Sequence, residues 1–297
     1  MDFLEKWRGK KIFITGAAGT VGQSLCQKLT QFGHCDVIGI DNNESEIFYL
    51  EQQYKSCDQA NFILCDIRDK DALLSHMRGC DIVLHAAALK HVTICEKSPR
   101  AALAANIFGV QNVVDAAFAC QVEKVLFTSS DKAVNPLNVM GTSKLMGERL
   151  VTAAELSRKS NDPNFSVTRF GNVLGSRGSV IPVFKKQIEQ GGPVTITDND
   201  MTRFIMTLDQ SVDLVLESAI LSQGGEVFIT KMPAINITDL AHVMIEYLAP
   251  QYGYKPEDIE IETIGARTGE KLYEELMNEE ECRRAYESSE FFIITPA

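Results

Sequence analysis

The sequence lacks the long apolar runs that mark membrane spans and secretory signals. No stretch approaches the roughly 20 consecutive apolar residues that a span needs, and the first residues, MDFLEK, mix acidic and basic side chains instead of opening an apolar signal core. We therefore expect no membrane span and a cytoplasmic protein.

Closely spaced cysteine pairs are also missing. The eight cysteines are scattered without a CxxC motif, and several lie in apolar runs such as NFILC at residues 61–65. Isolated thiols in apolar segments are typical of buried, reduced cysteines, whereas zinc sites and disulfide frameworks need clustered ones. The pattern therefore predicts neither a metal site nor a disulfide scaffold.

Basic residues are in deficit. The chain has 29 Lys and Arg against 40 Asp and Glu, a formal net charge of -11 at pH 7. A broad surface for nucleic acid or anionic lipid needs clustered positive charge, so we expect neither partner. Anionic ligands would be met by a few arginines and by backbone amides.

Short apolar runs alternate with helical patterns through the first half of the chain. The runs expected as strands cover residues 11–15, 36–41, 61–65, 81–86, 124–129 and 165–171. They show little in/out alternation, which is typical of parallel strands covered on both faces. Helical spacing of apolar residues predicts helices at 101–119 and from Asn138 to about residue 158. The pattern indicates an α/β fold with a doubly wound, Rossmann-type parallel sheet.

A glycine-rich turn follows the first expected strand. Gly16 opens it, and Gly19 and Gly22 flank Thr20 and Val21 at the start of an amphipathic helix. Glycines permit a tight turn and close approach of the backbone to a pyrophosphate, whose charge the helix N-terminus attracts. The order of strand, turn and helix makes this spacing indicative of a dinucleotide site.

An acidic residue ends the second expected strand. Asp41 lies nineteen residues after Gly22, where its carboxylate can accept hydrogen bonds from both ribose hydroxyls and would repel a 2′-phosphate. This favours NAD over NADP, with a helix-capping role for Asp41 as the alternative.

The ends of the next two strands supply further candidates for the cofactor pocket. Asp66 and Ile67 are placed to meet the adenine, with capping of the following helix as the alternative for Asp66. The small side chains of Ala86, Ala87 and Ala88 follow the fourth strand, where they suit a passing cofactor or a tight contact between sheet and helix.

Seven segments spread over nearly the whole chain carry a family resemblance. They are residues 15–22 (TGAAGTVG), 86–92 (AAALKHV), 130–136 (SDKAVNP), 138–144 (NVMGTSK), 169–179 (RFGNVLGSRGS), 201–204 (MTRF) and 265–271 (GARTGEK). With them the sequence resembles the extended short-chain dehydrogenases/reductases and, within these, the CapD-like nucleotide-sugar 4,6-dehydratases. The first segment is common to the superfamily, whereas SDK and KHV point to this branch.

The branch is also indicated by Met140, four residues before Lys144, where the superfamily normally has a catalytic tyrosine. By the resemblance, Lys144 binds the nicotinamide ribose and stabilises negative charge near O4 of the sugar. A thioether cannot accept a proton, so Met140 is expected to pack against the nicotinamide or the sugar. The resemblance also associates Met here with retention of the C5 configuration.

The reaction implied by the resemblance is an internal redox cycle on a nucleotide sugar, with UDP-N-acetylglucosamine the expected substrate. NAD takes hydride from C4, the C5 proton is removed, water leaves from C6, and hydride returns to C6. Asp131 would protonate the leaving hydroxyl and Lys132 would remove the C5 proton, which requires a protonated Asp131 and a partly neutral Lys132. Ser130 is expected to take the O4 proton, with Ser129 as the less favoured substitute. A surface ion pair is the alternative for Asp131 and Lys132.

Other residues resemble those that hold the substrate. Lys90 and His91 follow the fourth strand and are expected to face the sugar. Forked guanidiniums suit phosphate oxygens, although surface ion pairs are the alternative for each arginine. The candidates for the nucleotide and its diphosphate are Asn172, Arg177, Val180, Arg203 and Arg267, and Glu270 is expected either to hold an arginine or to bond the nucleotide ribose.

The domain division follows from these assignments. We expect an NAD-binding Rossmann domain over residues 1–172, with sheet elements returning near 225–250, and a mainly substrate-binding α/β region over residues 173–297. A homodimer or larger homo-oligomer is expected, because family members pair through the helices corresponding to 101–119 and 138–158.

Two rival functions remain open. A nucleotide-sugar 4-epimerase would return hydride to C4, although such enzymes generally keep the tyrosine. A non-catalytic NAD-sensing regulator would explain Met140 as lost activity, although the presence of Ser130, Asp131, Lys132 and Lys144 together argues against decay.

Overall fold

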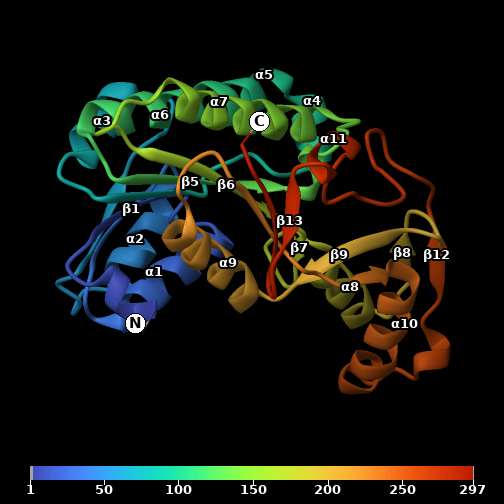
Figure 1. Cartoon of the computed structure of the whole chain (residues 1–297). Coiled ribbons are helices and arrows are strands. Elements are labelled where there is room, and N and C mark those ends of the chain that lie inside the picture. Colours follow the sequence, from blue (N-terminus) through green and yellow to red (C-terminus); the bar gives the residue numbers. More distant parts are fainter. Residues whose placement is uncertain (1–2, 297) are drawn as a thin grey trace.

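A nine-stranded sheet forms the centre of the molecule and lies between two layers of helices (Figure 1). The computed structural model describes residues 3–296. From β3 to β10 neighbouring strands are parallel, and β14 and β13 add an antiparallel edge. The predicted α/β, Rossmann-type fold is confirmed. The spatial order is β3 (Ala60–Leu64), β2 (Asp36–Asp41), β1 (Lys11–Thr15), β4 (Ile82–His85), β5 (Lys124–Ser130), β6 (Asn164–Phe170), β10 (Val227–Thr230), β14 (Phe291–Ile294) and β13 (Ala285–Glu287).

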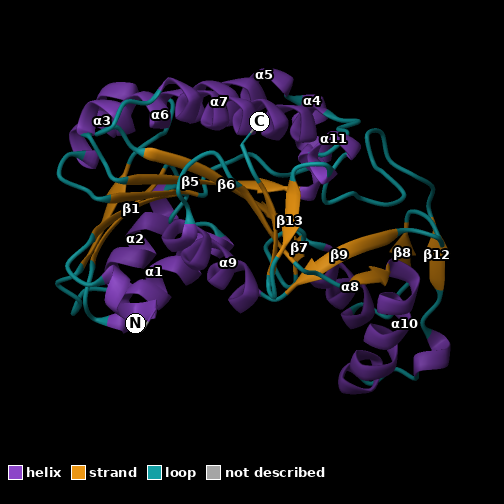
Figure 2. Ribbon diagram, viewed as in Figure 1, coloured by secondary structure: helices purple, strands orange, loops and turns teal. Residues whose placement is uncertain are grey.

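Helices cover both faces of this sheet (Figure 2). Alternate residues of β1 point to opposite faces, so Ile12 and Ile14 join one apolar cluster and Phe13 joins the other. Burial on both faces explains why these strands form unbroken apolar runs in the sequence. One face packs against α1 (Thr20–Phe32), α2 (Glu44–Gln53) and α9 (Leu208–Leu221), and the other against α3 (Lys70–Met77), α6 (Gly109–Cys120) and α7 (Val139–Ser157).

The strand order reverses next to β1, which pairs with β2 on one side and with β4 on the other. In open parallel sheets, ligands bind outside the carboxyl ends of the strands at such a reversal. The loops that carry Gly16, Ala86 and Asp131 follow β1, β4 and β5 and leave the sheet at this edge.

A smaller lobe is built mainly from the second half of the chain. Helices α8 (Val180–Glu189) and α10 (Ile237–Leu248) pack together there, and Phe184, Ile188 and Met244 belong to a separate apolar cluster. Its strands form one sheet of β7 (Asn172–Val173), β9 (Thr202–Met206) and β11 (Ala234–Asn236) and another of β8 (Val194–Ile196) and β12 (Ile261–Thr263).

The large sheet takes elements from both sides of residue 172. β10 returns beside β6, α9 contacts β5 and β6, and β14 and β13 extend the edge. The helix expected at 239–248 is α10, which packs in the smaller lobe and not on the large sheet.

Short helices make up further parts of the chain. They are η1 (Phe3–Trp7), α4 (Val92–Lys97), η3 (Asp131–Ala133), η4 (Ala249–Tyr252), η5 (Pro256–Asp258) and α11 (Glu279–Cys282).

The helical run Pro99–Cys120 corrects one sequence prediction. It comprises α5 (Pro99–Leu103), the π-helical turn η2 (Ala104–Phe108) and α6, and an 18-residue window in it has a mean hydropathy of at least 1.2. By length and composition alone it could cross a membrane, so the expectation that no stretch comes close was wrong. In the fold, 39% of that window is buried. Val110, Val113 and Val114 belong to the core of the sheet, which accounts for part of the apolar composition, whereas Leu103 and Phe108 of the same run are exposed.

Candidate active site

The glycine-rich turn after β1 is too tight for side chains. Gly16 has a φ of 71°, and a Cβ there would lie 2.7 Å from the Ala87 nitrogen. A Cβ at Gly22 would lie 2.1 Å from the Gly16 carbonyl oxygen. Gly19 is the N-cap of α1 and offers no side chain, so the first amides of the helix are left for an external acceptor. Such a terminus binds phosphate groups.

A buried hydrogen bond joins the ends of β1 and β4 beneath this turn. Thr15 Oγ1 lies 2.6 Å from His85 Nδ1 and accepts a 3.2 Å hydrogen bond from the Ala87 amide. Burial, reinforced by the charge of Lys144, lowers the pKa of His85 to about 3. The imidazole is therefore neutral at physiological pH, and the Thr15 hydroxyl beside it links the loop of Ala87 to the end of β1.

Asp41 faces a cavity of about 340 Å³ at this edge. Its Oδ2 accepts from the Ala18 amide at 3.1 Å and its Oδ1 from the Asn43 amide at 3.0 Å. Asn43 itself caps α2, so the capping alternative for Asp41 is wrong. The lining includes the predicted cofactor residues Gly16, Gly19, Asp41, Asp66, Ile67, Ala86, Ala87 and Ala88. A dinucleotide fits this donor set, with phosphate amides at one end and a carboxylate for ribose hydroxyls at the other.

Asp66 is already paired within the chain. It accepts from Arg68 Nε at 2.9 Å, from Arg68 Nη2 at 2.5 Å and from Asn42 Nδ2 at 3.1 Å. These hydrogen bonds, chiefly those from Arg68, hold the pKa of Asp66 well below its ordinary value. The alternative role as a cap is wrong, because Asp69 is the N-cap of α3.

The predicted reacting groups meet at the end of β5. Ser130 Oγ donates a 2.8 Å hydrogen bond to Asp131 Oδ1, and Lys132 Nζ donates to the same oxygen at 3.0 Å. Asp131 is fully buried, and its Oδ2 has no hydrogen-bond partner among the described residues. The Lys132 side chain is 19% exposed, so the alternative of a solvated surface ion pair is wrong.

Lys132 has two further neighbours. It donates to Asn172 Oδ1 at 3.1 Å, which brings one predicted substrate residue to the reacting lysine. Its Nζ also lies 3.7 Å from Glu274 Oε1. Glu274 was not predicted from the sequence; the available signal was its position three residues after the GARTGEK segment.

Met140 and Lys144 lie on the first turns of α7. Met140 is buried and packs in a small cluster with Cys95 and Ala102. Lys144 Nζ donates to the Thr128 carbonyl oxygen at 2.9 Å and lies 4.7 Å from the centre of the Phe127 ring. Burial, opposed by the charge of Glu148, lowers the pKa of Lys144 to about 8.

The loops after β4 and β7 meet above the glycine-rich turn. The Arg177 amide donates to Thr20 Oγ1 at 3.3 Å, and the guanidinium pairs with Glu46 at 2.9 Å. A Cβ at Gly178 would lie 2.4 Å from His91, so the two loops are in contact. Burial, reinforced by the charge of Arg177, lowers the pKa of Lys90. Lys90 and Arg177 therefore lie together beside the phosphate-binding end.

The remaining predicted substrate residues divide into two groups. Asn172, Val180 and Arg203 line one small cavity in the lobe. Arg203 is buried and donates to the carbonyl oxygens of Thr202, Lys271 and Leu272 at 2.7–3.2 Å. Arg267 is exposed, and its amide donates to Glu270 at 3.3 Å. The structure therefore shows the Arg203 guanidinium bound to backbone carbonyl oxygens, whereas Arg267 is exposed and Glu270 is partly exposed.

Clusters of potential metal ligands are absent from the described part of the chain. Among residues 3–296, no group of three or more His, Cys, Asp or Glu is arranged to hold a metal ion. Around the end of β5 the site brings together the carboxyl groups of Asp131 and Glu274, the amine of Lys132 and the hydroxyl of Ser130, and Lys144 binds the Thr128 carbonyl oxygen of the same strand.

The fold and this site together define a Rossmann-type enzyme of the extended short-chain dehydrogenase/reductase class that acts on nucleotide sugars. More particularly, the chain belongs to the polysaccharide biosynthesis protein family, whose model matches residues 12–296.

Several known proteins are similar over nearly their whole lengths. The crystal structure of Pen from Bacillus thuringiensis has a TM-score of 0.94 and 43% identity, covering 98% of this chain and 89% of that one. A Methanocaldococcus jannaschii protein named as an uncharacterized membrane protein is 48% identical over 99% of this chain and 88% of its own length. A Campylobacter jejuni protein named UDP-N-acetylglucosamine 4,6-dehydratase (inverting) is 39% identical, covering 98% and 84%.

A fourth relative has a different name. The Rickettsia canadensis protein named UDP-glucose 4-epimerase is 39% identical over 96% of this chain and 82% of its own length. Identity at this level supports the family and leaves the choice of reaction to the residues of the site.

Proposed function

We propose that this chain is an NAD-dependent nucleotide-sugar 4,6-dehydratase, a hydro-lyase whose substrate is UDP-N-acetylglucosamine. The observation that carries the proposal is the contact of Ser130, Asp131 and Lys132 at the buried end of β5. The similar protein of Campylobacter jejuni with that named activity supports the substrate. When bound, NAD would supply the acceptor that takes the C4 hydride and returns it to C6.

The cofactor would be held by the cavity of about 340 Å³ that Asp41 lines at the carboxyl edge of the sheet. The first amides of α1 would bind the pyrophosphate, Asp41 the adenosine ribose, and Lys144 the nicotinamide ribose. Burial lowers the pKa of Lys144 to about 8, which is still above neutral pH, so the amine keeps its charge there and would stabilise negative charge at O4.

The proton chain starts at Ser130. Its hydroxyl donates to Asp131 Oδ1, so Ser130 Oγ can take the O4 proton while passing its own proton to Asp131. Asp131 thereby becomes an acid and gives this proton to the C6 hydroxyl, which leaves as water. The O4 proton and the C6 hydroxyl together account for the water released. Asp131 needs no proton before substrate binds, unlike the expectation from the sequence.

Lys132 completes the chemistry at C5. Its amine removes the C5 proton once C4 is a ketone and returns the proton to C5 after hydride reaches C6. A single base that removes and returns the proton on one face retains the C5 configuration. We therefore propose retention, although the Campylobacter relative is named as inverting.

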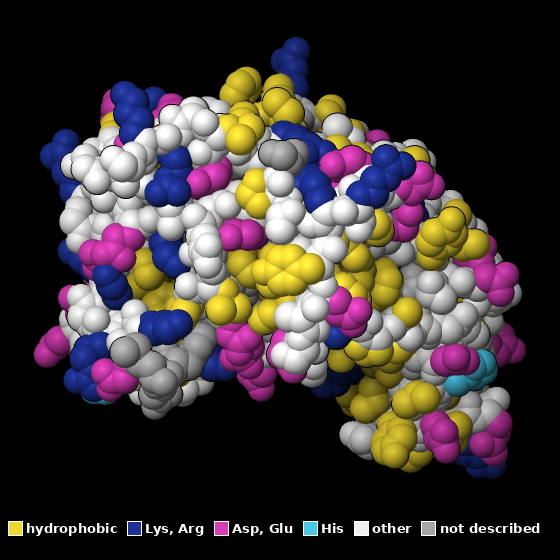
Figure 3. Space-filling view, in the orientation of Figure 1, with side chains coloured by type: hydrophobic (Ala, Val, Ile, Leu, Met, Phe, Trp, Pro, Cys, Tyr) yellow, Lys and Arg dark blue, Asp and Glu magenta, His cyan; other side chains and the backbone are white. Residues whose placement is uncertain are grey.

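We propose a homodimer in the cytoplasm as the working form. Hydrophobic side chains gather at the top of the molecule over α5 and α7 (Figure 3). Leu103 at the end of α5, Phe108 at the end of η2 and Met146 on α7 are 43%, 58% and 45% exposed. An apolar surface shared by two neighbouring helices is suited to pairing with a second copy.

A nucleotide-sugar 4-epimerase is the second candidate, because the Rickettsia relative carries that name. An epimerase returns hydride to C4 and needs neither an acid at C6 nor a base at C5. The buried Asp131 and the partly buried Lys132 therefore favour dehydration.

Incubation with UDP-N-acetylglucosamine in heavy water, followed by mass spectrometry and proton NMR, tests the proposal. We expect loss of water, solvent deuterium at C5 and transfer of the C4 hydrogen to C6. An isomer of unchanged mass would establish the epimerase instead. NAD binding without turnover of any nucleotide sugar would favour the sensor.

A further inference from the structure

Glu274 is a buried carboxyl group beside the reacting lysine. Its residue is 8% exposed, and its Oε1 lies 3.7 Å from Lys132 Nζ. Its Oε2 lies 3.8 Å from Lys271 Nζ and has no hydrogen-bond partner among the described residues. A buried carboxyl group is costly to retain unless nearby charge or function compensates for its desolvation.

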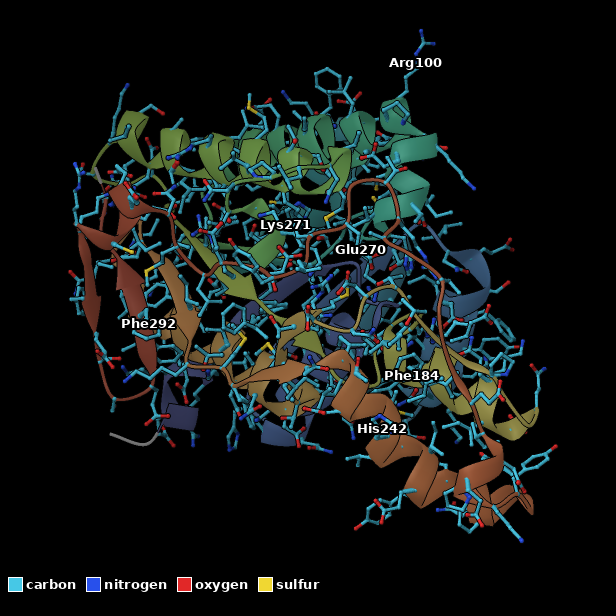
Figure 4. The ribbon with its side chains drawn as sticks, turned by 90° about the vertical axis from the view of Figure 1, so that its right-hand side faces the viewer. Arg100, Phe184, His242, Glu270, Lys271 and Phe292 are labelled. Carbon is cyan, nitrogen blue, oxygen red and sulfur yellow. The ribbon has the colours of Figure 1, made fainter. Side chains whose placement is uncertain are left out.

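The segment that carries Glu274 is held in place from both sides. Before it, Arg203 donates to the carbonyl oxygens of Lys271 and Leu272. After it, Arg169 donates to the Leu276 carbonyl oxygen at 3.0 Å and pairs with Glu281 at 2.6 Å. Figure 4 shows Glu270 and Lys271 on this segment, between the helical layer that carries Arg100 and the lobe that carries His242.

We propose that Glu274 is a positioning residue for Lys132, which orients the amine and stabilises its ammonium form through charge. The role rests on the proposed function, because it concerns the lysine assigned to the C5 proton. A base whose ammonium form is stabilised is a stronger proton acceptor once it is neutral. Glu274 would therefore affect C5 deprotonation and leave C4 oxidation unchanged.

Four charged groups face Glu274 from the elements around it. Lys132 and Asp131 belong to η3, Arg203 to β9, and Lys271 to the same segment. Burial raises the pKa of Glu274, while the charge of Lys132 opposes this shift and that of Asp131 adds to it. As pH rises through this raised pKa, Glu274 becomes a carboxylate and strengthens its attraction for the Lys132 ammonium.

The test compares Glu274→Gln with wild type across pH, in the full-length protein with NAD and UDP-N-acetylglucosamine. C5 deprotonation is followed as solvent deuterium exchange and C4 oxidation as transient NADH absorbance. Loss of the carboxylate should move the acid limb of the C5 exchange profile to lower pH by about one unit. The rate of C4 oxidation and the KM should be unchanged, and Glu274→Asp should restore part of the shift.

Glu275→Gln is the matched control, because it makes the same change on the neighbouring residue, whose carboxylate accepts from Asn135 at 2.9 Å. Its C5 profile should match that of wild type. An unshifted profile in Glu274→Gln would overturn the positioning role, and so would an equal loss of C4 oxidation and C5 exchange, which indicates a structural role. Failure of wild type to dehydrate any nucleotide sugar would overturn the proposed function as well.

Discussion

Ser130 is the residue whose loss best tests the proposed proton chain. Replacing it with Ala removes the hydroxyl that bonds Asp131 Oδ1 at 2.8 Å. Positioned acid–base groups contribute about 100-fold or more to rate, so Ser130→Ala should slow C4 oxidation by that factor. Transient NADH absorbance after mixing with UDP-N-acetylglucosamine measures this step.

Ser129→Ala is the control, since it deletes the same hydroxyl one residue earlier. Ser129 Oγ is buried and has no hydrogen-bond partner in the described part of the chain, so its loss should leave C4 oxidation intact. Full activity of Ser130→Ala, or a loss confined to Ser129→Ala, would show that another group takes the O4 proton.

Single residues also show what the sequence could and could not reveal. Asp131 and Lys132 are adjacent in the chain, so their shared contact was predictable from a motif. Glu274 reaches Lys132 only because the chain folds back, and no local pattern records that approach. Arg203 was expected to bind phosphate, but its three donated bonds go to backbone carbonyl oxygens that only the fold brings near.

At the scale of elements, a buried ion cluster joins β6, α7 and α11. Arg169 is 1% exposed and pairs with Glu148 at 2.7 Å and with Glu281 at 2.6 Å. Arg169→Met would leave two buried carboxylates without their partner. Breaking a buried pair costs about 3–5 kcal/mol, so the free energy of unfolding in urea should fall by that amount.

Lys10→Gln provides the comparison for this loss. Lys10 pairs with Glu123 at 2.5 Å, but the two side chains are 30% and 50% exposed. A solvent-exposed pair contributes about 0–1 kcal/mol, so this variant should unfold nearly as wild type does. Equal destabilisation by the two substitutions would contradict a special role for the buried cluster.

Strands of the large sheet could be predicted from the sequence, whereas the short strands of the smaller lobe could not. The bounds of strands β1 and β2 were predicted correctly at both ends. Both strands are buried on two faces, which requires a continuous run of apolar residues that can be recognised in the sequence. The short strands of the lobe were not identified. β8 pairs with the distant β12, and β9 lies between β7 and β11, so their pairing depends on tertiary contacts that three to five residues cannot encode.

At the scale of the whole molecule, the proposed dimer gives the last test. Phe108, at the end of η2, is 58% exposed beside the apolar surface over α5 and α7, and a carboxylate there would have to be desolvated on pairing. Phe108→Asp should therefore shift the mass measured by light scattering from dimer to monomer. Tyr247→Asp, at a 72% exposed position of α10 in the smaller lobe, should leave the dimer intact. All groups assigned to catalysis come from one chain, so the monomer should still bind NAD. A monomeric wild type would show that the chain does not dimerise. Dissociation caused by Tyr247→Asp would show that the contact surface includes α10 instead.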